Sequence, residues 1–284
     1  MKKAIILFLT LILIVTLPAY AAGESRAVIG ADLTEEQINE VYSLMGAARG
    51  SMPELRMTND IERSYLEGYI PDEVLGTRSI SSVLVTMTEG ENSVQCANVN
   101  WCTESMYLSA MATAGIENVS VKVAAPFEVS GTAALAGIYM AYEDMTGESL
   151  SEDGKTAGIL DLLTTGELAE ELGDDEALTL VTELKLILNE TMEMSDEELY
   201  EKIDDIAEEY KIPLNDYQRE KHRELCRSFE KLDPDELSEK VQKVKNTIEK
   251  VGEMKEKAVT FWDKIVEFFK VIGEFISKLM GIFS

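Results

Sequence analysis

The chain has 284 residues, enough for one large domain or two smaller ones, and it is strongly acidic, with 53 Asp and Glu against 26 Lys and Arg. A hydrophobic content of 45% with six prolines excludes a largely disordered chain, and the net charge of −27 argues against nucleic acid, whose phosphates it would repel. The single histidine excludes metal and catalytic sites built on two imidazoles.

The first 21 residues predict an export signal. Lys2 and Lys3 form a charged start, residues 4–17 are apolar, and Ala19-Tyr20-Ala21 supplies the small residues of a cleavage site. The apolar run is short for a stable membrane span, which makes an uncleaved anchor the less favoured alternative. We therefore expect an extracytoplasmic protein, secreted or attached to the cell envelope. Without Lys2 and Lys3 its net charge is about −29.

Residues 22–150 begin by alternating strand and helix patterns, which predicts a mixed α/β domain. A strand over 26–32 stops at Thr34, which with Gln37 forms a capping box for a helix. A strand over 53–59 and a helix over 59–70 follow. Two β-branched runs, SISSVLVTMT and SVQCANVNW, flank EGEN and predict an antiparallel β-hairpin.

The rest of this domain repeats the alternation. Thr103 caps a helix over 104–115, and NVSVKVAAP reads as a further strand. Ser130 then opens a helix rich in small residues, which runs to Met145.

Beyond a polar linker over 147–154, the strand patterns disappear. Helices are expected over 157–172, 176–193, 195–210 and 215–232, with a capping box at Ser195. We place the domain boundary near residue 150 and a helical region over 151–232. The predicted class is α+β: a mixed α/β domain followed by helices.

Residues 233–284 predict one long amphipathic helix. It starts at Asp233-Pro234-Asp235-Glu236, an N-cap followed by proline at the first helical position. Apolar residues then recur at alternating spacings of four and three, with Lys255 as the exception. This seam comprises Leu237, Val241, Val244, Ile248, Val251, Lys255, Ala258, Trp262, Ile265, Phe269, Ile272, Ile276, Leu279 and Phe283.

The tail from Phe261 to Ser284 has too broad an apolar face to remain in water. It folds back on the helical region, pairs with another chain as a homo-oligomer or partner contact, or lies in a lipid interface; a polar stripe makes it amphipathic rather than transmembrane. Residues 238–284 carry nine Lys and seven acids, in contrast to the acidic remainder. The predicted contact residues are Phe261, Trp262, Ile265, Phe268, Phe269, Ile272, Phe275, Ile276, Leu279 and Phe283.

Ser130 is the candidate nucleophile, because it lies between a strand and a helix beside Gly131, where backbone N–H groups favour an anion. A helix cap explains the same residue, and this is the interpretation we favour. Lys122 is the nearby candidate base. The sequence thus leans away from an enzyme.

The linker acids Asp144, Glu148, Glu152 and Asp153 are candidate Ca²⁺ ligands, although they lack the spacing of an EF-hand loop. No cofactor is expected.

Three cysteines complete the candidates. Cys96 and Cys102 are either a disulfide or, as we favour, two free thiols, because one extended strand would hold their Cα atoms about 20 Å apart. Cys226 lies one helical turn after His222, and a structural role is favoured for this pair over a nucleophile or half of a metal site.

Three segments together resemble one family: AVIGADLTEEQ, GYIPDEVLGTRSISSVLV and ENVSVKVAAPFEVSGTAALAGIYMAYEDMTG. They are similar to domain of unknown function 1002, the YpuA-like exported proteins of Gram-positive bacteria, from about Val28 to Leu163 and more loosely beyond. The resemblance implies bacterial origin, export and a whole-chain architecture, without an activity to transfer. Cys96, Cys102 and Glu128 depart from the family pattern.

Three functions follow as expectations. The favoured one is a non-catalytic binding protein at the cell envelope. The alternatives are an envelope hydrolase or transferase using Ser130 or a carboxylate pair, and an oligomeric structural protein assembled through the C-terminal seam.

Overall fold

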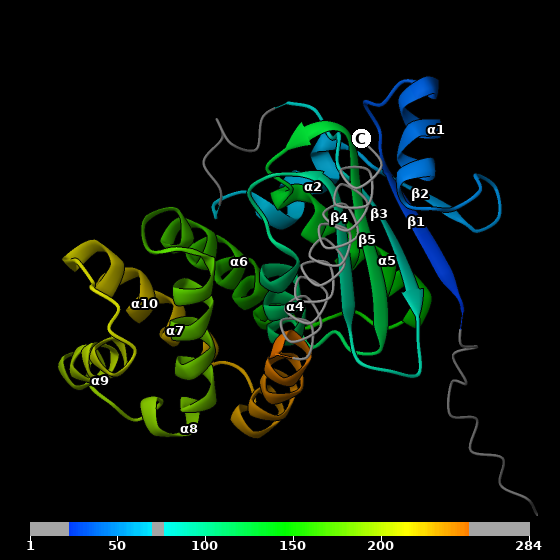
Figure 1. Cartoon of the computed structure of the whole chain (residues 1–284). Coiled ribbons are helices and arrows are strands. Elements are labelled where there is room, and N and C mark those ends of the chain that lie inside the picture. Colours follow the sequence, from blue (N-terminus) through cyan, green and yellow to red (C-terminus); the bar gives the residue numbers. More distant parts are fainter. Residues whose placement is uncertain (1–22, 70–76, 250–284) are drawn as a thin grey trace, which may run out of the picture.

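The computed structural model describes residues 23–69 and 77–249, and it confirms the α+β class (Figure 1). Five strands form one mixed sheet: β1 (Ser25–Gly30), β2 (Glu54–Met57), β3 (Ser82–Met87), β4 (Ser93–Val99) and β5 (Val119–Val129). Their order is β2-β1-β3-β5-β4. β1 pairs with β2 in parallel and with β3 antiparallel, while β5 pairs with β3 antiparallel and with β4 in parallel.

The predicted hairpin is wrong, because β5 lies between β3 and β4. The burial of the strands explains the insertion. Val119, Val121 and Val123 of β5 are at most 1% exposed, which suits a central strand, whereas Ser93 and Gln95 of β4 are exposed, which suits an edge. Asn92 also fastens the β3–β4 loop to β5, accepting from Val119 N at 3.0 Å and donating to Ile116 O at 2.7 Å.

Helices cover both faces of the sheet (Figure 1). α1 (Glu35–Leu44) packs on the face that carries Ala27, Ile29 and Leu84. α2 (Asn59–Leu66), α4 (Glu104–Thr113) and α5 (Thr132–Thr146) pack on the opposite face, around Val28, Val83 and their neighbours. Alternating residues of each strand therefore supply two separate cores.

The helical region contains α6 (Glu152–Leu172), α7 (Asp174–Leu186), the short α8 (Leu188–Thr191), α9 (Asp196–Glu209) and α10 (Asp216–Phe229). The helix expected over 176–193 is thus broken between α7 and α8. The predicted capping boxes at Thr34 and Ser195 are confirmed, as is the cap at Thr103. Ile159 and Leu162 of α6 share a core with the sheet, so the two regions are packed together.

A last helix covers residues 234–249, and we call it the C-terminal helix. Asp233 caps it as predicted, since its Oδ1 accepts from the backbone N–H groups of Asp235 and Glu236, both at 3.0 Å. Leu237, Val241 and Val244 are at most 9% exposed. The first positions of the predicted seam therefore pack against the protein's own body.

Within residues 23–69 and 77–249, no helix is both long and apolar enough to cross a membrane.

Candidate functional site

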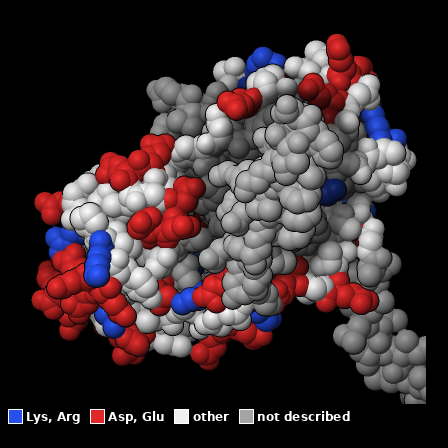
Figure 2. Space-filling view, viewed as in Figure 1, with Lys and Arg blue, Asp and Glu red and all other residues white. Residues whose placement is uncertain are grey.

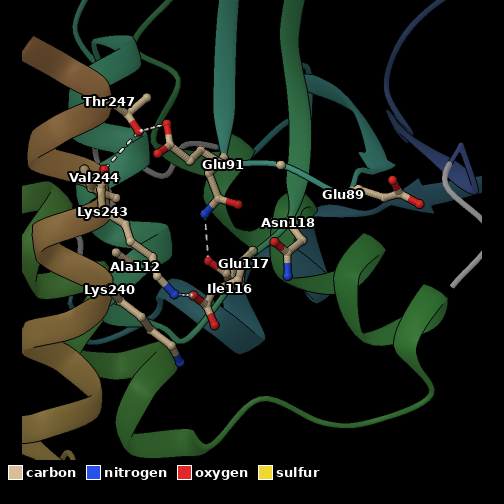
Figure 3. Close-up of a pocket in the computed structure, with 12 residues that line it drawn as sticks. Glu89, Glu91, Ala112, Ile116, Glu117, Asn118, Lys240, Lys243, Val244 and Thr247 are labelled. Carbon is tan, nitrogen blue, oxygen red and sulfur yellow. Dashed lines mark hydrogen bonds and ion pairs between the residues drawn. The ribbon is translucent and has the colours of Figure 1, made fainter. Parts of the chain in front are cut away.

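A groove of about 300 Å³ lies between the C-terminal helix and two loops of the sheet region, and we call it the C-terminal groove (Figure 3). The β3–β4 loop and the α4–β5 loop form one wall, and the C-terminal helix forms the other. The lining residues are Glu89, Gly90, Glu91, Asn92, Ala112, Ile116, Glu117, Asn118, Lys240, Lys243, Val244 and Thr247.

The two loops are fixed by local backbone geometry. α4 ends at Thr113 and is followed by Gly115, whose φ of +86° is favourable for glycine, and the chain then turns through Asn118 at φ +61°. Asn118 belongs to one of the few residue types that tolerate this conformation. Asn92 holds the facing loop through its buried side chain. The body wall of the groove is thus formed without the C-terminal helix.

Charged contacts fasten the helix to this wall. Lys243 Nζ lies 3.1 Å from Glu117 Oε1, and Thr247 donates to Glu91 Oε2 at 3.0 Å (Figure 3). On another side of the helix, Lys245 Nζ lies 2.7 Å from Glu183 Oε1. Hydrogen bonds to Glu239 and Glu117 raise the pKa of Lys243, and one to Glu183 raises the pKa of Lys245.

These contacts hold the C-terminal helix on the body. Surface ion pairs of this kind contribute about 0–1 kcal/mol each, whereas burying a Leu or Val side chain contributes about 1.5–3 kcal/mol. The apolar residues of the C-terminal helix therefore supply most of the free energy that docks it. Its lysines fix the position of the helix on the acidic body. Figure 2 shows how widely Asp and Glu cover the visible face of the helical region.

The structure places Ser130 between β5 and α5, but Ser130 does not cap α5. The N-cap is Gly131 at φ +92°, without a side-chain cap, and Ser130 Oγ lies 3.5 Å from Thr132 Oγ1. The predicted cap is therefore wrong. A side chain at Gly131 would meet Tyr107 and Val99 at 2.5 Å, so glycine is required there and takes over the cap position.

The predicted base, Lys122, is not positioned to activate Ser130. Its Nζ donates to Met45 O at 2.8 Å, on the side of the sheet covered by α1. Eight residues of extended chain separate it from Ser130, about 26 Å.

The four linker acids do not converge. Arg26 Nε lies 2.5 Å from Asp144 Oδ2, Lys155 Nζ lies 2.7 Å from Glu152 Oε1, and Lys231 Nζ lies 3.6 Å from Asp153 Oδ1, while Glu148 is exposed. In the part of the chain that the structure describes, no group of three or more His, Cys, Asp or Glu side chains could hold a metal ion.

The three cysteines are free thiols, so the alternative of a Cys96–Cys102 disulfide is wrong. Burial raises the pKa of each thiol to about 12, which suppresses the reactive thiolate. His222 is also buried, with Nδ1 2.8 Å from Gln218 O, and burial lowers its pKa to about 4.

Sequence reasoning missed a buried polar cluster between the two regions. Lys185 Nζ lies 2.5 Å from Asp161 Oδ2 and 2.7 Å from Ser109 Oγ, while Thr113 donates to Asp161 at 2.8 Å. Lys185 and Asp161 are at most 1% exposed. Burial lowers the pKa of Lys185, and the charge of Asp161 opposes that fall. Asp161 and Lys185 each interrupt an apolar run, GILDLL and LKLIL. A charged residue within an apolar run is the sequence feature that could have predicted a buried ion pair.

A second buried group, Glu62 on α2, was also missed. It is 2% exposed, and burial raises its pKa to about 7. Its Oε2 has no hydrogen-bond partner among the residues that the structure describes.

The tail contacts predicted from Phe261 to Phe283, like the export signal, lie outside the described residues. The C-terminal helix leads directly toward that segment in the sequence.

The chain that forms this mixed sheet and the helices after it matches one uncharacterised family. The family model described as protein of unknown function (DUF1002) matches residues 29–259. The chain therefore belongs to this family, as the resemblance implied. The chain is 33% identical over 241 residues to the uncharacterized protein YpuA of Bacillus subtilis (strain 168), and the match covers 83% of each chain. No solved structure gives a significant match. The matched region includes the C-terminal groove and ends before the tail at Phe261.

Proposed function

We propose that this protein is exported and acts at the cell envelope by binding rather than by catalysis. The observation that carries the proposal is the docking of the C-terminal helix, whose apolar seam and lysines hold it on the body. In the sequence, the C-terminal helix precedes the predicted amphipathic tail, which we propose as the contact segment. The groove and the tail are then two parts of one binding protein.

The candidate nucleophiles support binding over catalysis. The thiols have a raised pKa, Ser130 is not paired with Lys122, and Lys185 is buried against Asp161. An envelope hydrolase or transferase using Ser130 would need activation of its hydroxyl, for which the described contacts give no support, while the alternative that uses a carboxylate pair stays a prediction.

Oligomerisation through the whole seam is less favoured for a specific reason. Leu237, Val241 and Val244 are already buried against the same chain, so pairing from these positions would require the C-terminal helix to undock. Pairing through the tail alone remains compatible with the docked helix.

Two measurements test the proposal. Mass spectrometry of protein from the native host should give a mature N-terminus at or near Ala22, and fractionation should place the protein outside the cytoplasm. An intact Met1 on a cytosolic protein would contradict export.

Removal of the tail after Thr260 tests the binding arm. We expect loss of liposome or envelope co-sedimentation with an unchanged, monomeric fold. Phe268→Glu with Phe275→Glu should reproduce that loss, whereas Asp263→Asn with Glu267→Gln, on the polar stripe, should not. Loss of a dimer would indicate that the tail pairs with a second copy of this chain. A large fall in melting temperature would mean that the tail belongs to the core. If truncation changes none of these properties, the tail has no binding role.

A further inference from the structure

A cleft of about 340 Å³ lies between α2 and the first turns of α6, where the sheet region meets the helical region. Tyr69 is 40% exposed, and its hydroxyl lies 3.1 Å from Thr156 Oγ1. Ligand sites occur preferentially at such junctions. We call it the tyrosine cleft; its lining residues are Ser64, Tyr65, Tyr69, Glu152, Lys155, Thr156 and Ile159.

The inner wall of the cleft is held in place by contacts within the protein. The ring of Tyr65 packs edge-on against Tyr139 with 6.3 Å between centroids, and its hydroxyl donates to Glu143 Oε2 at 3.3 Å. Lys155 Nζ lies over the same ring, 5.4 Å from its centroid. Because these groups are fixed before a ligand arrives, binding would cost little side-chain ordering.

The charges of the cleft argue against an ionic ligand. The ammonium of Lys155 already occupies the position over Tyr65 that a ligand cation would take. Glu152 and Glu143 neutralise that ammonium at 2.7 and 3.4 Å, and the chain as a whole carries a net charge of −27, which disfavours an anion.

The remaining groups suit a neutral ligand with many hydroxyls. The hydroxyl of Ser64 donates to Ile61 O at 2.6 Å and those of Tyr69 and Thr156 bond each other, so their oxygens can still accept hydrogen bonds from a ligand. Glu152 and Lys155 accept and donate hydrogen bonds, and the exposed ring of Tyr69 offers an apolar face. A sugar ring presents hydroxyls at its edge and C–H groups on its face. We propose that the tyrosine cleft binds a neutral saccharide of one or two rings.

This inference rests on the proposed function, since it supplies a ligand class for a binding protein of the cell envelope. The site is separate from the C-terminal groove, because the two share no lining residue.

Calorimetric titration of the mature full chain with N,N′-diacetylchitobiose and maltose, two neutral saccharides of two rings, tests the cleft. We expect saturable binding of at least one of them, weakened about tenfold by Tyr69→Ala because the stacking face is removed. Tyr69→Phe keeps that face and should retain most of the affinity. Thr156→Val provides a second weakening variant on α6.

Tyr217→Ala is the matched control. Tyr217 is 56% exposed on α10 and its hydroxyl also bonds another side chain, Glu167 Oε2 at 3.0 Å, but it lies outside the cleft. Its removal should leave binding unchanged.

Absence of binding by either saccharide would overturn the inference, as would equal binding by the wild type, Tyr69→Ala and Thr156→Val. The proposed function fails separately. A protein that co-sediments with envelopes but binds neither saccharide keeps the function and loses the cleft, whereas a saccharide-binding protein found in the cytosol keeps the cleft and loses the function.

Discussion

The sheet region and the helical region bury titratable side chains that respond to pH in opposite directions. Glu62, beside the sheet, has a pKa raised from 4.5 to about 7, so its contribution to stability is present at low pH and is lost as pH rises through 7. His222, in the helical region, has a pKa lowered from 6.5 to about 4, so its contribution is present at neutral pH and is lost as pH falls through 4. Acid should weaken the helices first, and alkali the sheet region.

The contact between the two regions is of another kind, a buried ion pair. Asp161 on α6 and Lys185 on α7 share hydrogen bonds with Ser109 of α4, which packs on the sheet. Breaking such a pair leaves a buried charge without its partner. Whether the sheet region and the helical region unfold separately or together therefore depends first on the Asp161–Lys185 pair.

Lys185→Met should give the largest effect, a loss of about 3–5 kcal/mol in the free energy of unfolding, because Asp161 keeps a buried charge. Urea unfolding at pH 7 measures it. Lys202→Met is the control, since Lys202 pairs with Glu190 at the surface and should cost less than about 1 kcal/mol. Asp161→Leu combined with Lys185→Met should recover much of the loss. A cost below 1 kcal/mol for Lys185→Met alone would show that the pair does not hold the regions together.

His222→Gln should flatten the acid side of the stability profile. The wild type should lose about 3 kcal/mol through this residue between pH 6.5 and 4, since the imidazole takes up a proton in the unfolded chain while the buried imidazole stays neutral. The difference between variant and wild type, followed by urea unfolding at several pH values, isolates this residue from the carboxylates. Parallel profiles would contradict the lowered pKa.

Glu62→Gln should act on the other side of the profile. At pH 8 the variant should be about 3 kcal/mol more stable than the wild type, because the wild type then keeps an ionised carboxylate in a buried site, and near pH 4 the two should agree. Glu67→Gln, at the end of the same helix and with a side chain 68% exposed, is the control and should change little. A pH-independent difference would show that Glu62 acts through packing.

Local signals in the sequence predicted local structure well. The capping boxes at Thr34 and Ser195 and the start at Asp233 depend on neighbouring residues, and the structure has them. The prediction of a hairpin between β3 and β4 was wrong because β5, a more apolar strand that follows later in the chain, pairs with both of them. Neighbouring residues in the sequence do not report such a pairing. The C-terminal groove and the tyrosine cleft could not be predicted, since each joins segments that only tertiary packing brings together.

The smallest expected effect on the free energy of unfolding comes from the serines at the start of one helix in each region, α9 and α5. Ser195 Oγ accepts from Glu198 N at 3.3 Å as a true cap of α9, and Ser195→Ala should cost about 1 kcal/mol. Ser130→Ala should cost less than about 0.5 kcal/mol, because Gly131 is the N-cap of α5 and, among the described residues, the Ser130 hydroxyl contacts the Thr132 hydroxyl at 3.5 Å rather than a backbone N–H group of the helix. Thermal and urea unfolding of both variants measure the difference. Equal losses of stability in the two variants would restore the interpretation of Ser130 as a helix cap. Covalent labelling of Ser130 by a serine-directed probe would favour the hydrolase alternative, since only an activated hydroxyl reacts in that way.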